Sequence, residues 1–152
     1  MFERYSENAR KVFSIAKQEA QKLRHDHIGT EHLLLGLIEV KQGFAAEILK
    51  KENVDLPHTR KLVQEMVTHG QGPEDADYSF LPRTQHAQTV FDDAVKEARQ
   101  LKHNIIGTEH ILLGLLYENQ GIGAKVIQSL GLKLDDVRND VIKFIRQGKQ
   151  PA

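Results

Sequence analysis

The sequence contains no cysteine. This absence excludes disulfide bonds, thiolate nucleophiles and thiolate metal ligands, and it fits a protein of a reducing compartment. Net charge is missing as well, because 21 lysines and arginines balance 21 aspartates and glutamates. A neutral chain has no overall field that would draw it to nucleic acid or to an anionic membrane.

Long apolar runs are also absent. No stretch of the chain approaches the roughly 18 apolar residues that a membrane span needs, and the first residues, MFERYSENARKVF, carry no apolar run before their charges. We therefore expect no membrane contact and a cytoplasmic location, or an organelle stroma if the source bears plastids. With 39% apolar residues, the chain has the composition of a folded globular protein.

What the sequence does contain is an internal repeat. At an offset of 78, residues 9–46 lie over residues 87–124, and 20 of these 38 pairs are identical, where chance would give about one in fifteen. The longest identical block is IGTEH, at 28–32 and 106–110, followed by LLLGL and ILLGL. One structural unit therefore occurs twice, and because each half is too small to bury much apolar surface alone, we expect the halves to share a core.

Apolar residues within each repeat keep helical spacing. Residues 9–23 and 87–101 place apolar side chains three or four positions apart along one face, with Ser6 and Thr84 at matching N-cap positions. Thr30 and Thr108 are read as the N-caps of second helices so rich in leucine that they belong in the middle of the domain.

Third helices are expected over FAAEILKKE and IGAKVIQSL, and fourth helices from DLP at 55–57 and from Asp135-Asp136. No segment alternates with strand period. The prediction is an all-α fold of eight helices in two pseudo-symmetric four-helix repeats. Its parts are repeat 1 over residues 1–69, a linker over 70–83, repeat 2 over 84–147 and a flexible tail over 148–152.

Motifs for catalysis and for nucleotide binding are absent. The chain has no phosphate-binding GxxxxGK[ST] loop, no GxGxxG and no GxSxG. His25, His27 and His32 crowd one turn, but His27 becomes Ile105 in the second copy, and TEH does not match the HExxH metal motif. We expect no metal, no cofactor and no catalysis, with the histidines as capping or packing residues.

Glu31 and Glu109 are more informative. Each lies in the first turn of a leucine-rich helix, where the helix dipole alone would explain a carboxylate. If each carboxylate also lay beside the N-terminus of another helix, capped by Ser6 or Thr84, it could recognise a ligand that carries both a cation and an anion. Phe2 and Phe80, which also match at the offset of 78, either staple the first helices or offer apolar anchors to a peptide.

The blocks IGTEHLLLGL and IGTEHILLGL, preceded by MFERYSENARKVF, closely resemble the N-terminal domain of the ClpC branch of Clp unfoldases. The resemblance covers nearly the whole chain. It implies a double four-helix module, expected to be monomeric in isolation, that receives protein substrates and MecA-like adaptors for ATPase rings lying outside this chain. ATP is expected only in those rings.

The resemblance also implies binding of phosphoarginine-tagged proteins, with the guanidinium held by Glu31 and Glu109 and the phosphate near Ser6 and Thr84. The apolar patch that takes cyclic peptides in some relatives falls on Phe2, Arg10 and Phe80. Many relatives read TPRAKKV where this chain reads TQHAQTV at 84–90, and the linker adds acidic residues. These changes predict weaker phosphate attraction at the second-repeat site.

Two further functions stay open at this stage. A free-standing module that sequesters adaptors, tags or cyclic peptides would have the same binding surface, and a small helical enzyme would depend on a histidine rather than on the glutamates. The leading hypothesis is a substrate- and adaptor-docking domain of a ClpC-like unfoldase with no activity of its own.

Overall fold

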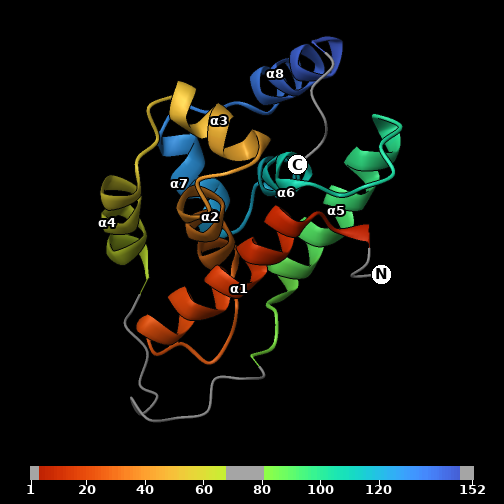
Figure 1. Ribbon diagram of the computed structural model, residues 1–152. Helices are drawn as coiled ribbons and strands as arrows, with labels where there is room; N and C mark the ends of the chain where they lie inside the picture. The colour runs from red at the N-terminus through yellow and green to blue at the C-terminus, as the bar shows by residue number, and fades with distance from the viewer. Residues whose placement is uncertain (1–3, 68–80, 148–152) are drawn as a thin grey trace.

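The computed structural model describes residues 4–67 and 81–147, which form eight α-helices (Figure 1). These are α1 (Glu7–Lys22), α2 (Thr30–Glu39), α3 (Phe44–Lys51), α4 (Leu56–Met66), α5 (Gln85–Gln100), α6 (Thr108–Glu118), α7 (Ile122–Ser129) and α8 (Leu134–Arg146). The all-α prediction is confirmed, because β-type pairing within the described residues is limited to two isolated bridges. The tail at 148–152 and most of the predicted linker lie outside these residues.

The first helices begin where the sequence predicts. The Ser6 hydroxyl accepts the Ala9 N–H at 3.1 Å, and the Thr84 hydroxyl accepts the Ala87 N–H at 3.1 Å. Each bond satisfies one of the backbone donors that a helix start leaves without an intrahelical partner, an effect worth about 1 kcal/mol. The buried faces of α1 and α5 then pack against α2 and α6.

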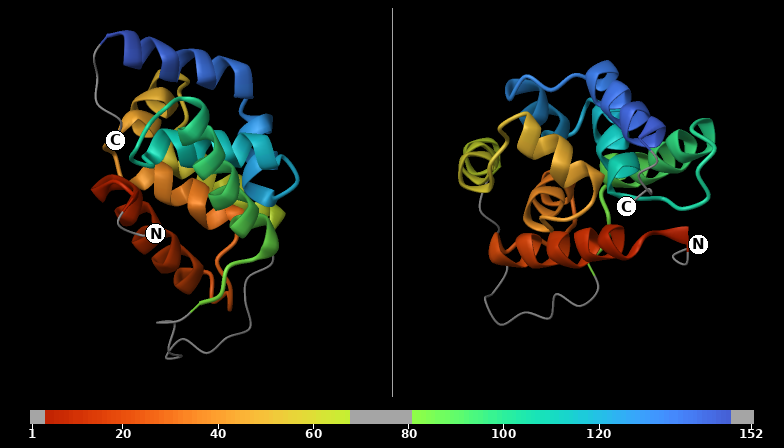
Figure 2. Two further views of the ribbon diagram at one scale, coloured as in Figure 1. Left: turned by 90° about the vertical axis from the view of Figure 1, so that its right-hand side faces the viewer. Right: turned by 45° about the horizontal axis from the view of Figure 1, so that its top comes forward.

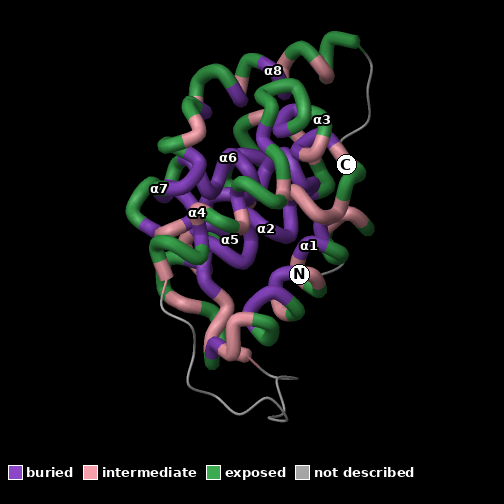
Figure 3. The backbone as a smooth tube through the Cα atoms, turned by 90° about the vertical axis from the view of Figure 1, so that its left-hand side faces the viewer, coloured by how far each residue is buried: buried purple, intermediate pink, exposed green. Residues whose placement is uncertain are grey.

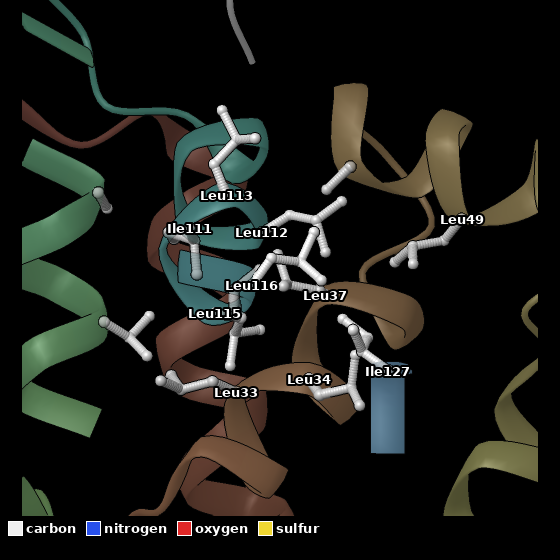
Figure 4. Close-up of a cluster of buried hydrophobic side chains, with 14 of the residues drawn as sticks. Leu33, Leu34, Leu37, Leu49, Ile111, Leu112, Leu113, Leu115, Leu116 and Ile127 are labelled. Atoms are coloured by element: carbon white, nitrogen blue, oxygen red, sulfur yellow. The ribbon is translucent and has the colours of Figure 1, made fainter. Parts of the chain in front are cut away.

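Helices α2 and α6 form the centre of the molecule, with α1 and α5 on one side and α3 and α8 on the other (Figures 1 and 2). Nearly all of their residues are buried, as the tube in Figure 3 shows. Side chains from both helices meet in one cluster that spans the two repeats, drawn in Figure 4. Full burial of a leucine stabilises the fold by roughly 1.5–3 kcal/mol, so the shared core is the main source of stability.

Glycine at matching positions lets the central helices come close to their neighbours. A Cβ at Gly36 would lie 2.7 Å from the Val12 carbonyl oxygen, and one at Gly114 would lie 2.5 Å from that of Val90. Either contact would push α1 from α2, or α5 from α6, so the shared Gly has a packing role in both copies.

The pseudo-symmetry extends into the fourth helices, beyond the part where sequence identity is visible. Arg60 of α4 donates to the buried Glu19 of α1 at 2.5 Å, and Arg138 of α8 donates to the buried Glu97 of α5. Both members of the second pair lie 78 residues after those of the first. These ion pairs attach each fourth helix to the first helix of its own repeat.

The two repeats also exchange hydrogen bonds. Gly29 and Gly107, rather than Thr30 and Thr108, are the N-caps of α2 and α6, so the N-cap assignment was wrong by one residue. The Thr30 hydroxyl instead accepts the Gly123 N–H of α7 at 2.9 Å, and the Thr108 hydroxyl accepts the Ala45 N–H of α3 at 3.2 Å. Because α3 and α7 start at glycines without a capping side chain, each takes its cap from the other repeat.

Candidate functional site

The predicted binding residues come together across the repeats, not within them. The Ser6 N–H donates to the Ile106 carbonyl at 2.9 Å, and the Thr84 N–H donates to the Ile28 carbonyl at 3.0 Å. Each first-helix cap therefore lies beside the turn that leads into the other repeat's glutamate. We call Glu31 with Thr84 the Glu31 site, and Glu109 with Ser6 the Glu109 site.

This exchange changes where the sequence departures act. The replaced basic residues at 84–90 were expected to weaken the site in the second repeat, which contains Glu109. The backbone bonds instead place Thr84 beside the turn before Glu31. His86, one of the changed residues, contacts Glu118 through Nδ1 at 2.5 Å, and Glu118 in turn accepts the Gly121 N–H at 2.8 Å. The expected loss of phosphate attraction therefore belongs to the Glu31 site.

Both glutamates are almost fully withdrawn from solvent. Glu31 is 4% exposed and Glu109 is 0% exposed. Burial raises the pKa of Glu31, while the Glu31 N–H and the neighbouring His27 and His25 partly oppose that rise. A Cβ placed on Gly29 would lie 1.8 Å from Oε1 of Glu31, so the carboxylate folds over a backbone position where only glycine fits.

A chain of two histidines supports each glutamate turn. His32 Nδ1 accepts the Gly29 N–H at 2.8 Å, and its Nε2 lies 3.0 Å from Nδ1 of His25. Since Nδ1 of His32 has no proton, the neutral ring carries its proton on Nε2 and donates to His25. His110 and His103 repeat the arrangement, with distances of 2.8 Å and 2.7 Å. The capping role predicted for His32 and His110 is confirmed.

Burial keeps these capping histidines neutral. It lowers the pKa of His32 to about 3 and that of His110 to about 3, with the second histidine of each chain adding to the effect. A protonated ring could not accept the glycine N–H, so the cap exists only in the neutral form. The two turns therefore depend on uncharged histidine.

His103, Glu109 and His110 present ligand atoms within 4.8 Å of one another, which resembles the donor set of a zinc site. The capping bond argues against a metal there. A metal on Nε2 of His110 would leave a ring whose two nitrogens both act as lone-pair donors, which requires an anionic imidazolate or loss of the Gly107 bond. The group fits its hydrogen-bonding role better than a metal.

The predicted apolar patch is only partly visible. Phe2 and Phe80 lie outside the described residues, and Arg10 is exposed on α1. Sequence reasoning did not find the exchange between repeats, and two near-identical halves offer no signal that would have shown it. None of the described helices is long and apolar enough to cross a membrane.

Comparison with known proteins adds to this geometry. The family model of the Clp repeat (R) N-terminal domain matches twice, over residues 4–85 and 82–152. The chain is 44% identical over 145 residues to the ATP-dependent Clp protease ATP-binding subunit ClpA homolog of Guillardia theta, covering 95% of this chain and 17% of that protein. It is 41% identical over 150 residues to the chaperone protein ClpC1, chloroplastic, of Oryza sativa subsp. japonica, covering 99% of this chain and 16% of that protein.

A solved structure shows the same fold. The N-terminal domain of the caseinolytic protease associated chaperone ClpD from Arabidopsis thaliana superposes with a TM-score of 0.76 at 22% identity. The match covers 96% of this chain and 97% of that one. The chain thus corresponds to about a sixth of the length of the two sequence relatives and to nearly the whole of this solved domain.

Proposed function

The chain belongs to the Clp repeat N-terminal domain family, and we propose that it is the substrate- and adaptor-docking domain of a ClpC-like protein unfoldase. It is homologous to the N-terminal part of Clp ATPase subunits and chaperones. In this proposal it presents protein substrates and MecA-like adaptors to ATPase rings outside the chain, and it has no catalysis or cofactor of its own.

We further propose that the Glu31 site and the Glu109 site bind phosphoarginine on tagged proteins. A phosphorylated guanidinium combines a cationic and an anionic part. A carboxylate can accept hydrogen bonds from the guanidinium, while the N-terminus of α1 or α5 favours the phosphate. The observation that carries the proposal is the pairing of each glutamate turn with the first-helix cap of the other repeat.

The burial of the glutamates adds a condition to this proposal. With Glu31 4% and Glu109 0% exposed, a guanidinium can reach either carboxylate only if nearby chain moves aside. In exchange, an ion pair formed there would be shielded from water and from salt. The Glu31 site should be the weaker of the two for phosphate, because the altered residues at 84–90 lie on its side.

The partners follow from the same assignment. They are tagged or unfolded proteins, adaptors and the remainder of the Clp ATPase, with no nucleic acid or membrane and a monomeric isolated domain. The chloroplast relatives support a plastid stroma as the alternative to the cytoplasm. A free-standing module that sequesters adaptors or cyclic peptides is the second candidate, and it uses the same surface.

Calorimetric titration of the chain with a phosphoarginine peptide tests the proposal. We expect saturable binding at two sites of unequal affinity, and no binding of the same peptide with phosphoserine, which lacks the guanidinium. A parallel titration with a MecA-like adaptor tests the docking role separately. Absence of binding to both ligands would refute the proposed function.

A further inference from the structure

A second type of site lies on the outer face of α5, away from the two glutamate carboxylates. Residues of α5, of the segment before α1 and of the turn before α6 line a groove of about 350 Å³. We call it the arginine groove and define it by its basic and apolar members: Arg4, Arg83, Arg99, Phe91, Val95 and Ile106.

Apolar residues form the floor of the arginine groove. Phe91 and Ile106 are buried, and Val95 is half-buried. The rings of Tyr5 and Phe13 meet edge to face at 5.0 Å between centroids, and Phe13 meets Phe91 in the same way at 5.0 Å. Edge-to-face aromatic contacts of this kind fix ring positions, so the floor is a preformed apolar surface.

Positive charge surrounds that floor. Arg4, Arg83 and Arg99 are exposed, and Arg83 lies over the Phe91 ring at 4.0 Å from its centroid. Asp92 is the one acidic residue among those that line the groove, and Gln88 donates to its Oδ1 at 3.1 Å. Two positive charges are therefore in excess here, on a chain whose net charge is zero.

The groove belongs to the second repeat only. At the offset of 78, the first repeat has Gln21 where the second has Arg99, and Lys17 where the second has Val95. A basic residue in the last turn of α5 is favoured by the helix dipole, but this reason applies equally to the end of α1, where Gln21 stands. The combination of an apolar floor and flanking guanidiniums is thus not a requirement of the fold.

We propose that the arginine groove binds an acidic protein segment in which an aromatic or aliphatic side chain is flanked by carboxylates. The apolar side chain would cover Phe91 and Val95, and carboxylates would pair with Arg83 and Arg99, where planar guanidiniums can bind them in a bidentate manner. A groove of about 350 Å³ accommodates a short segment rather than a folded domain. The inference rests on the proposed docking function for its biological use, but its chemistry is independent of phosphoarginine.

Fluorescence anisotropy with a labelled acidic peptide tests the inference. The probe has five residues, a phenylalanine between two pairs of aspartates. We expect it to bind the chain, to lose affinity as salt rises, and to bind at least about 10-fold more weakly to Arg99→Glu, because one attraction is lost and one repulsion is added. Replacing the central phenylalanine of the probe by alanine should also weaken binding.

The matched control is Lys61→Glu, which makes the same charge change on an exposed residue of α4, at the other side of the molecule from α5 (Figures 1 and 2). It should leave the affinity unchanged. Equal loss in both variants, or equally effective competition by an oligothymidylate, would show attraction by charge alone and overturn the inference. The Glu31→Gln, Glu109→Gln double variant should bind the probe normally, so failure of phosphoarginine binding and failure of this inference are distinguishable.

Discussion

Replacing both buried carboxylates, by Glu31→Gln and Glu109→Gln, is expected to weaken phosphoarginine binding by about 100-fold or more. Removing one partner of a buried, hydrogen-bonded charge pair costs about 2–5 kcal/mol, and every 1.4 kcal/mol is about tenfold in affinity. Glutamine keeps the size of the side chain but loses the charge. In calorimetry, each single variant should remove one site and leave the other. Unchanged affinity in the double variant would contradict the assignment of the sites.

The same substitution should raise stability. Burial raises the pKa of Glu31 in the folded state, so the stability that its protonated form supplies is lost as pH rises through that pKa. At neutral pH, Glu31→Gln removes a desolvated charge and is expected to stabilise the fold by about 1 kcal/mol, as changes at binding sites often do. Urea denaturation at pH 7 measures this. Marked destabilisation together with lost binding would instead indicate a structural role for Glu31.

Acidification from pH 7 to pH 5 is expected to destabilise the fold by about 4 kcal/mol, with His32 and His110 contributing about 2 kcal/mol each. Their pKa values are lowered to about 3 in the folded state, against about 6.5 when unfolded. The unfolded chain therefore binds more protons between these values, and stability falls as pH falls below about 6.5. Glu31, whose pKa is raised, opposes this trend at lower pH.

Urea denaturation across this pH range measures the effect, with His32→Gln as the informative variant. Glutamine at this position can still accept the Gly29 N–H but does not titrate, so about half of the pH dependence should disappear. His58→Gln is the control, because His58 is exposed on α4, and it should leave the pH dependence unchanged. A stability profile that is flat between pH 7 and pH 5 would contradict neutral, buried capping histidines.

Much of the architecture was predictable because it rests on local rules. Ser6 and Thr84 begin their helices as expected, and the leucine-rich helices lie in the centre because no face of them is polar enough for water. The N-cap of α2 was misplaced by one residue, because Gly29 and Thr30 are adjacent residues that both serve as caps. The sequence could not show that the Thr30 hydroxyl is used by Gly123 of the other repeat.

The composition of each site was beyond the sequence for a related reason. Because the two repeats share IGTEH and equivalent cap residues, a contact within one repeat and a contact between repeats predict the same residue types. The assignment of Thr84 to the turn of Glu31 comes only from the backbone bonds of residues 28 and 82–84. Duplication therefore identified which residues form the sites but not how they are paired.

Pairing across the repeats is the central claim, and affinity for phosphoarginine in single-site backgrounds tests it most directly. In Glu109→Gln, where the Glu31 site remains, Thr84→Ala should weaken binding by about 10-fold, while Ser6→Ala should leave it unchanged. Both substitutions remove the N-cap of an equivalent helix, so each is a control for the stability of the other. A loss of affinity caused by Ser6→Ala and not by Thr84→Ala would contradict the exchanged sites and place each site within its own repeat.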